Sequence, residues 1–274
     1  MDLQFAKYHG AGNDFVLVDN RAGHFDPTRE RVAALCHRRF GVGADGLMTL
    51  ERDPLLEFRM RYFNADGGES TMCGNGGRCI ALFAEHLGIG GRVKEFMGSD
   101  GLHSATVDAD GADGGVVTLR MVDVAQVVHE QGFFFLNTGS PHYVEFVDDL
   151  DGLDVDTLGR EIRRDGAFAE IGGTNVNFVR IDGYGRIAVR TYERGVEAET
   201  WACGTGATAA AIAAHLYRFP NCLSFGVDVR GGELRVAFRT VGDGFTDVML
   251  TGPARRVFSG VIDPDGLVHR AVRF

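Results

Sequence analysis

Two cysteines occupy equivalent places in two similar segments of the sequence. Cys73 begins the run C-G-N-G and Cys203 begins the run C-G-T-G, and each run leads into an apolar stretch typical of a helix. Each thiol is therefore expected at a helix N-terminus, where free backbone amides and the positive end of the helix dipole lower a thiol pKa from its usual value of about 8.5. The same amides can bind a carboxylate. A thiolate beside a bound carboxylate is suited to removing a proton from an α-carbon.

The recurrence of this segment in the second half of the chain predicts a duplicated lobe. Two lobes related by an approximate two-fold would place Cys73 and Cys203 on opposite sides of one cleft. One thiolate would then remove the α-proton from one face of a substrate while the other thiol protonates the opposite face, which inverts the carbon. Because two thiolates at close range repel each other, the working pair is expected to carry one proton.

The elements that must position these cysteines are mostly short strands, which indicates an α+β fold. We expect two pseudosymmetric lobes, each a mixed, largely antiparallel β-sheet wrapped around a central α-helix. The central helices are predicted at 79-87 and 207-216, because 207-216 is apolar on nearly every side. The N-terminal lobe, carrying Cys73, is predicted over 1-123 and can be completed by 260-274. The C-terminal lobe, carrying Cys203, is predicted over 124-259.

Strands are expected near 3-8, 14-19, 46-52, 58-63, 92-97, 101-108 and 115-122 in the first lobe, and near 142-147, 174-181, 185-192, 223-229, 233-239 and 246-250 in the second. Further helices are predicted at 156-164 and at 27-37, the latter capped by Asp26 with Pro27 in its first position. The run from Gly41 to Gly46 matches G-x-G-x-x-G. It follows a helix and precedes a strand, the reverse of a dinucleotide site, so we interpret it as a turn.

Composition excludes several classes of partner. The net charge of -10, with the basic residues dispersed, argues against nucleic acid. The first residues lack the pattern of a signal peptide, and no apolar run reaches the roughly 20 residues of a membrane span, so a cytoplasmic protein without membrane contact is expected. Lys7 and Lys94 are the only lysines. Since pyridoxal phosphate enzymes need a lysine for a Schiff base, no such cofactor is expected.

The five cysteines lack the paired C-x-x-C spacing of zinc or redox sites, so reduced thiols and no metal are expected. We interpret Cys36, Cys79 and Cys222 as buried structural residues. A lone cysteine before a helix is also usually structural. The matched glycine motifs are what favour a functional role for the pair.

Several further segments, together with the two cysteine motifs, resemble diaminopimelate epimerase. In chain order the segments are His9-Gly10-Ala11-Gly12-Asn13-Asp14-Phe15, Phe63-Asn64-Ala65-Asp66-Gly67, Cys73-Gly74-Asn75-Gly76, Gly139-Ser140-Pro141-His142, Asn175-Val176-Asn177-Phe178, Glu193-Arg194-Gly195, Ala202-Cys203-Gly204-Thr205-Gly206 and Thr251-Gly252-Pro253-Ala254. The resemblance implies the two-lobed fold of that family. It also implies an isomerase that converts LL-2,6-diaminopimelate to the meso form without pyridoxal phosphate, in the route to lysine and peptidoglycan precursors.

At matching positions the resemblance implies specific roles. Cys73 and Cys203 would be the acid/base pair, with His142 and Glu193 close to the reacting centre. The backbone amides that would hold the reacting carboxylate belong to Gly74, Asn75, Gly204 and Thr205. The side chains that would bind the polar ends of the substrate are Asn13, Asn64, Asn175, Glu193 and Arg194.

Three positions depart from the family pattern. Ser140 stands where many members carry asparagine, and Gly46 where many carry glutamine, so two substrate contacts are expected to be shorter or replaced by water. Phe258 stands where some relatives carry a tyrosine linked to dimer formation. A homodimer here would therefore rest on different contacts.

Two other functions stay open at this point. One keeps the chemistry and changes the substrate, since proline-type and other amino-acid racemases share this fold and cysteine pair. The other is a non-catalytic protein in which Cys73 and Cys203 form a regulatory disulfide or line a ligand cleft. In each case the expected partner is a small molecule.

Overall fold

The computed structural model describes residues 2–70, 73–130 and 132–271, so residues 1, 71–72 and 272–274 of the predicted N-terminal lobe and residue 131 of the predicted C-terminal lobe lie outside the described residues. The chain divides into two compact units. One runs up to Leu119 and resumes at Pro253, and the other spans Arg120–Gly252. The chain passes from one unit to the other twice, first in β8 (Gly114–Arg120) and then in the long β17 (Gly244–Ile262).

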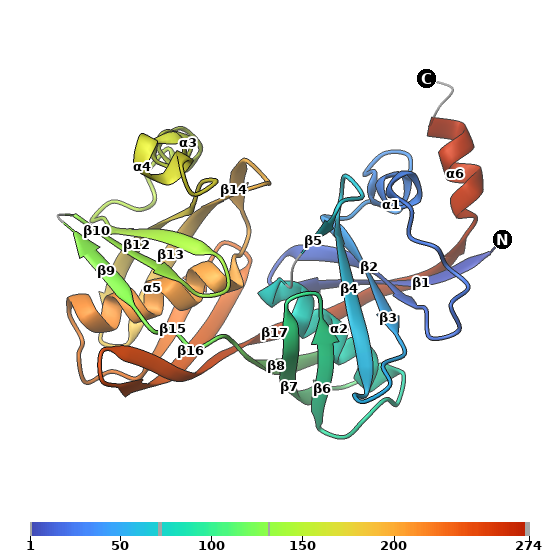
Figure 1. Cartoon of the computed structure of the whole chain (residues 1–274), viewed down its shortest axis with the longest axis horizontal. Coiled ribbons are helices and arrows are strands. Elements are labelled where there is room, and N and C mark those ends of the chain that lie inside the picture. The colour runs from blue at the N-terminus through green and yellow to red at the C-terminus, as the bar shows by residue number, and fades with distance from the viewer. Residues whose placement is uncertain (1, 71–72, 131, 272–274) are drawn as a thin grey trace. The chain divides into compact units, whose positions relative to one another are not determined.

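The first unit places its central helix within a ring of strands (Figure 1). Besides β8 and part of β17, its elements are β1 (Leu3–Gly10), β2 (Asn13–Asp19), α1 (Arg29–Cys36), β3 (Gly46–Glu51), β4 (Phe58–Asn64), β5 (Glu69–Ser70), α2 (Gly74–His86), β6 (Val93–Gly98), β7 (Gly101–Asp110) and α6 (Pro264–Ala271). The ring closes because β17 pairs with both β1 and β8.

The second unit has the same plan. Its elements are β9 (Val127–Glu130), β10 (Phe133–Asn137), β11 (Pro141–Phe146), α3 (Val155–Arg164), α4 (Gly166–Ala169), β12 (Asn175–Gly183), β13 (Arg186–Glu193), β14 (Ala198–Thr200), α5 (Gly204–Tyr217), β15 (Ser224–Val229), β16 (Gly232–Val241) and part of β17.

Strand pairing repeats in the same order in the two units. In the first unit β1/β2 is antiparallel, β2/β3 parallel, β3/β4 antiparallel, β4/β6 parallel and β6/β7 antiparallel. In the second unit β10/β11, β11/β12, β12/β13, β13/β15 and β15/β16 follow the same sequence of directions. This correspondence confirms the α+β class and the duplicated plan, with a mixed sheet around one helix in each unit.

The two central helices are enclosed because their sequences offer almost no polar face. In α5 every residue from Gly206 to His215 is buried, and in α2 every residue from Gly74 to Ala84 is buried. An alanine-rich helix such as α5 is thin enough to be surrounded by strands on several sides. Figure 1 shows each helix lying among the strands of its own unit.

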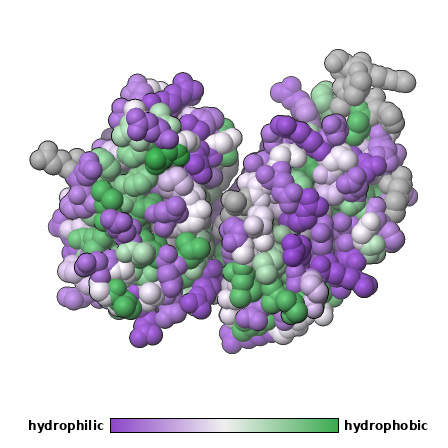
Figure 2. Space-filling view, viewed as in Figure 1, coloured by the Kyte–Doolittle hydropathy of each residue, from purple (hydrophilic) through white to green (hydrophobic). Residues whose placement is uncertain are grey.

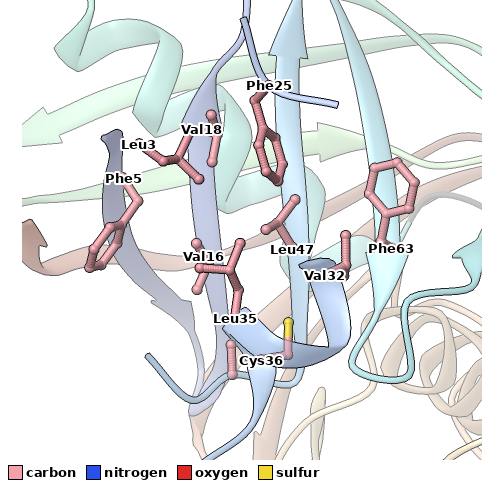
Figure 3. Close-up of a cluster of buried hydrophobic side chains, with 11 residues drawn as sticks. Leu3, Phe5, Val16, Val18, Phe25, Val32, Leu35, Cys36, Leu47 and Phe63 are labelled. Carbon is pink, nitrogen blue, oxygen red and sulfur yellow. The ribbon is translucent and has the colours of Figure 1, made fainter. Parts of the chain in front are cut away.

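The first unit has a second core between α1 and the outer face of its sheet. Figure 3 shows Val32 and Leu35 of α1 packed toward Val16 and Leu47 of the strands. The strands β2 and β3 are thus covered on both faces, which explains their nearly continuous apolar sequence. In the second unit, α3 packs in the same way against β12 and β13.

The surface is mixed in character. On the face seen in Figure 2, hydrophilic residues are interspersed with hydrophobic ones. Within the described part of the chain, each helix is too short or too polar to cross a bilayer.

Three predictions of helix starts were wrong. The helix predicted at 27-37 begins at Arg29, and its cap is Thr28 instead of Asp26, because the Thr28 hydroxyl accepts a hydrogen bond from the Arg31 amide at 3.4 Å. The central helices begin earlier than predicted, at Gly74 and Gly204, since the glycine-rich motif itself forms the first helical turn. Residues 41–45 lie outside any helix or strand and lead into β3, as interpreted, while Gly46 is already the first residue of that strand.

Candidate active site

Cys73 is the N-cap of α2. Its backbone is extended, with φ of -106° and ψ of 132°, and its carbonyl accepts the first helical hydrogen bond, from the Gly77 amide at 2.7 Å. The thiol is partly exposed, and its Sγ lies 3.8 Å from Oδ1 of Asn13. The amides of Gly74 and Asn75, in the first turn, belong to the set that a helix leaves without internal acceptors. The predicted thiol at a helix N-terminus is therefore confirmed.

Asn13 reaches Cys73 from the turn between β1 and β2. Ala11 and Gly12 both have positive φ, as a tight hairpin turn requires. The Asn13 amide nitrogen donates to Oδ2 of Asp45 at 2.6 Å, which leaves Oδ1 to accept from Asn75 Nδ2 at 3.2 Å and to face the Cys73 sulfur. The orientation of this amide is thus fixed by a carboxylate on the other side.

Asp45 belongs to a charged cluster with Asp14, Arg38 and Lys7. Arg38 bridges the two carboxylates at 2.8 Å and 2.6 Å, and Lys7 pairs with Asp14 at 2.7 Å. Burial would raise the pKa of Asp14, but hydrogen bonds from Arg38 and Lys7 outweigh it and hold that pKa at about 2. Sequence reasoning missed this cluster.

Arg78 is a second residue that sequence reasoning missed. Its side chain is fully buried in α2 and donates to Asn75 Oδ1 at 2.8 Å, to the Gly74 carbonyl at 3.2 Å and to the Pro253 carbonyl at 3.4 Å. Burial lowers the pKa of the guanidinium, and attraction to thiolate charge on Cys79 and Cys73 opposes that shift. The sequence feature that could have identified Arg78 is the presence of an arginine within an otherwise apolar helix.

Asn64 ends β4 directly opposite Gly46 of β3, and its side chain is exposed. Gly46 is confined, because a Cβ there would lie 2.6 Å from the Phe63 carbonyl oxygen and 2.6 Å from the Tyr62 ring. The space that a larger residue at position 46 would need is therefore occupied by Tyr62. Among the predicted residues of this unit, Asn13 lies against the Cys73 thiol, and Asn75 donates to Asn13.

Cys203 occupies the corresponding place in the second unit, as the N-cap of α5. Its φ is -119° and ψ 111°, and its carbonyl accepts from the Ala207 amide at 2.8 Å. The thiol is buried, and Sγ lies 3.4 Å from Oγ1 of Thr205. Gly206 must be glycine here, because a Cβ would lie 2.3 Å from Asn177 Oδ1 and 3.3 Å from the Cys203 sulfur.

His142 lies on β11 and is fully buried. Its Nδ1 is 3.1 Å from Asn177 Nδ2, and burial, the largest influence, lowers its pKa to about 3. The imidazole is therefore neutral at ordinary pH. Asn177, which contacts both His142 and the first turn of α5, is another functional candidate that sequence reasoning missed.

Asn175, Glu193 and Arg194 form a polar group at the ends of β12 and β13. The Asn175 amide nitrogen donates to Ser140 Oγ at 2.5 Å, and its Oδ1 accepts from the Arg194 backbone amide at 2.9 Å. Ser140 thus serves as an acceptor for Asn175. The Arg194 side chain is exposed, and Glu193 accepts from the Thr200 hydroxyl at 2.5 Å.

The described contacts arrange the predicted residues in two groups, one within each unit. Each group contains a thiol at a helix N-terminus, amides of the first turn and amide side chains anchored by further hydrogen bonds. Among the described residues, no three histidine, cysteine or acidic side chains cluster as metal ligands would. This chemistry suits proton transfer next to a bound carboxylate.

The fold is shared with solved structures of other proteins. A phenazine biosynthesis protein of the PhzF family from Bacillus anthracis superposes with a TM-score of 0.77 over 96% of this chain and 99% of its own, at 14% identity. A hydroxyproline epimerase from Agrobacterium vitis, with bound trans-4-hydroxy-L-proline, gives a TM-score of 0.68 over 97% and 94%, at 18% identity. At these identities the likeness establishes the fold.

Sequence comparison is more specific. The family model for diaminopimelate epimerase matches residues 5–125 and 134–257. A diaminopimelate epimerase from Flavobacterium psychrophilum is 44% identical over 95% of this chain and 100% of its own length. The chain therefore belongs to the diaminopimelate epimerase family, and it is an isomerase.

Proposed function

We propose that this enzyme converts LL-2,6-diaminopimelate to meso-diaminopimelate, without a cofactor, by acid/base chemistry at Cys73 and Cys203. One observation carries the proposal. The two cysteines are the N-caps of the central helices in two units of matching connectivity. A duplicated fold that repeats a thiol at the same point is suited to a reaction that needs a proton donor and an acceptor of the same kind.

In the proposed reaction, one Sγ takes the α-proton and the electron pair left on carbon delocalises into the substrate carboxylate. The other Sγ–H delivers its proton to the opposite face of that carbon. One proton leaves the substrate and one returns, so the pair ends with the roles of its members exchanged. Amides of Gly74, Asn75, Gly204 and Thr205 would hold the reacting carboxylate, where the helix N-termini favour its developing charge.

The remaining predicted residues fit the other end of a long, zwitterionic substrate. Asn13, Asn64 and Arg194 can donate to a carboxylate, and Glu193 can accept from an ammonium group. Asn175 would act with them by holding the backbone amide of Arg194. His142 and Glu193 would support the reacting centre. A substrate lacking the distal amino-acid end would leave buried polar groups unpaired, at about 1–3 kcal/mol each, and should react far more slowly.

The test is solvent-deuterium incorporation at the α-carbon, under reducing conditions and without added cofactor. Incubated in D2O with LL-diaminopimelate, the enzyme should yield the meso form with deuterium at the inverted carbon. Proline and histidine serve as comparison substrates. Turnover of proline without turnover of diaminopimelate would reassign the substrate, and an absence of exchange with every amino acid would leave a binding function.

Because the chain belongs to this family, we propose that the protein acts in lysine and peptidoglycan precursor synthesis, in the cytoplasm and as a homodimer. Three apolar side chains of β17 are exposed, at 56% for Val257, 47% for Phe258 and 61% for Val261, and a second copy could cover them. Analytical ultracentrifugation tests the assembly. A monomer at micromolar concentration would reject it.

A further inference from the structure

His142 carries an unused hydrogen-bonding atom in a sealed environment. Its side chain has no solvent exposure, and among the described residues no partner lies within hydrogen-bond distance of Nε2. Buried polar atoms of folded proteins nearly always have a partner, so Nε2 is expected to bond to a group that these contacts do not include. Whether that group must be a donor or an acceptor depends on which ring nitrogen carries the proton.

The neighbouring Asn177 decides this, because its own orientation is fixed. One side of its amide lies 2.8 Å from the backbone carbonyl of Tyr143, which can only accept. That side must therefore be Nδ2, and Oδ1 lies 3.0 Å from the hydroxyl of Thr191, which can donate. If the Asn177 amide were flipped, its Oδ1 would face the carbonyl oxygen of Tyr143, and neither atom could donate a hydrogen bond.

The second hydrogen on Asn177 Nδ2 points to His142 Nδ1, 3.1 Å away. That nitrogen must accept, so the proton of the neutral ring is on Nε2. The low pKa of about 3, which burial imposes, keeps the ring in this neutral form. The charged group that acts on His142 is the guanidinium of Arg194, which also disfavours a second positive charge.

We propose that Asn177 is a positioning residue that locks His142 as a neutral Nε2–H donor for an anion in the reaction. The same amide lies against the first turn of α5, where a Cβ on Gly206 would come within 2.3 Å of Asn177 Oδ1 and 3.3 Å of Cys203 Sγ. The anion is either the thiolate of Cys203 or a carboxylate of the substrate. The identity of the anion rests on the function proposed above, whereas the tautomer does not.

Nitrogen-15 NMR of the histidine rings tests the tautomer directly. In the wild-type protein at pH 7, His142 should show a protonated Nε2 and an unprotonated Nδ1, assigned by comparison with His142→Gln. A protonated Nδ1 would overturn the proposal. Thr191→Val is the matched control, because it removes the hydroxyl but leaves the carbonyl of Tyr143 to orient Asn177, and the tautomer should persist.

Replacing Asn177 tests the positioning role. In Asn177→Asp a carboxylate oxygen faces Nδ1, so the proton should move to Nδ1 and the ring should titrate at higher pH. The kcat should fall by at least about tenfold with little change in KM, and the pH profile should change shape. Asn177→Leu removes the hydrogen bond to His142 Nδ1 without adding charge, so His142 should show a mixture of tautomers. If both variants keep the wild-type tautomer and kcat, Asn177 has no such role.

The two anions are separated by following the Nε2–H resonance in Cys203→Ala. If the acceptor is the thiolate, the resonance of the free protein should shift with pH in the wild type and stay constant in this variant. If it is the substrate, adding LL-diaminopimelate should shift the resonance in both proteins. A resonance unaffected by pH and by substrate would refute the donor role. A protein that fails the D2O exchange assay but shows the Nε2–H tautomer would refute the proposed function alone.

Discussion

The guanidinium of Arg78 donates to the side-chain oxygen of Asn75, one turn earlier in α2, across 2.8 Å, and both side chains are sealed from solvent. In the described part of the chain, Arg78 has no carboxylate partner, and its contacts are carbonyl and amide oxygens. The second unit carries Thr208 at the matching position of α5. A buried positive charge therefore accompanies Cys73, while a neutral hydroxyl accompanies the helix of Cys203.

We predict that Arg78→Leu raises the pKa of the Cys73 thiol, because a nearby cation favours the thiolate. Iodoacetamide labelling over a range of pH, quantified for each cysteine by mass spectrometry, measures the change. Arg78→Lys keeps the charge and should shift the profile less, and Thr208→Val is the neutral control in α5. An unchanged Cys73 profile in folded Arg78→Leu would show that this charge does not act on the thiol.

Removing either proposed catalytic sulfur should stop the reaction. Cys73→Ala and Cys203→Ala should each lower the rate of epimerisation by at least about 100-fold, since each loses one acid/base group. Circular dichroism should show that both variants stay folded. Cys36→Ala is the control, because burial raises the pKa of that thiol to about 12 and it should be inert. Near-normal activity in either test variant would rule out two-base chemistry.

Gly206→Ala should damage the second unit at its thiol. The added Cβ would meet Asn177 Oδ1 at 2.3 Å, so the helix turn or the amide must shift, which costs about 1–3 kcal/mol of unfolding free energy. The epimerisation rate should fall with it. Gly166→Ala is the matched control, since nothing lies within 4 Å of its Cβ position. Urea unfolding and the epimerisation assay measure both variants. Equal stability and activity would show that a Cβ at position 206 does not clash with Asn177.

Stability should fall in mild acid because of His142. Its pKa is about 3 in the folded protein and about 6.5 in an unfolded chain, so below pH 6.5 the unfolded chain binds a proton that the folded protein does not. The free energy of unfolding should therefore decrease as the pH falls towards 3, by about 2 kcal/mol between pH 7 and 5 from this group. Urea unfolding of wild type and His142→Gln at both values checks this. The free energy of unfolding of His142→Gln should fall less between pH 7 and pH 5 than that of the wild type. An equal fall in both proteins would show that another group titrates.

The position of both cysteines was predictable because it depends on local sequence. A repeated glycine motif ahead of an apolar stretch determines a helix and its cap without reference to the rest of the chain, and Cys73 and Cys203 are both caps. Most strands could be found for the same reason. Four strands were not predicted, which are β5, β9, β10 and β14. The two-residue β5 and three-residue β14 exist only through their pairing with β4 and β13.

The supports of the site were not predictable. Asp45 holds Asn13 from 32 positions away, and Asn177 holds His142 from 35 positions away. Contacts of this kind arise from the path of the chain in space and leave no periodic pattern in the sequence. The changes of unit lie at 119/120 and 252/253, whereas the lobes were predicted to change at 123/124 and 259/260, and no glycine- or proline-rich linker marks a boundary placed at or inside strands. The roles assigned to the site residues stay predictions until they are tested.

The pairing of β1 with β17 joins Leu3 to Ile262. During synthesis on the ribosome, β1 can pair with β2 at once, but its other edge must wait for β17, which follows almost all of the remaining chain. The unit from Arg120 to Gly252 is continuous in the sequence, so all of its strands are synthesised within a shorter stretch of chain. Contacts so distant along the sequence slow folding, so the early exposed edge of β1 is where a newly made molecule would be open to wrong partners.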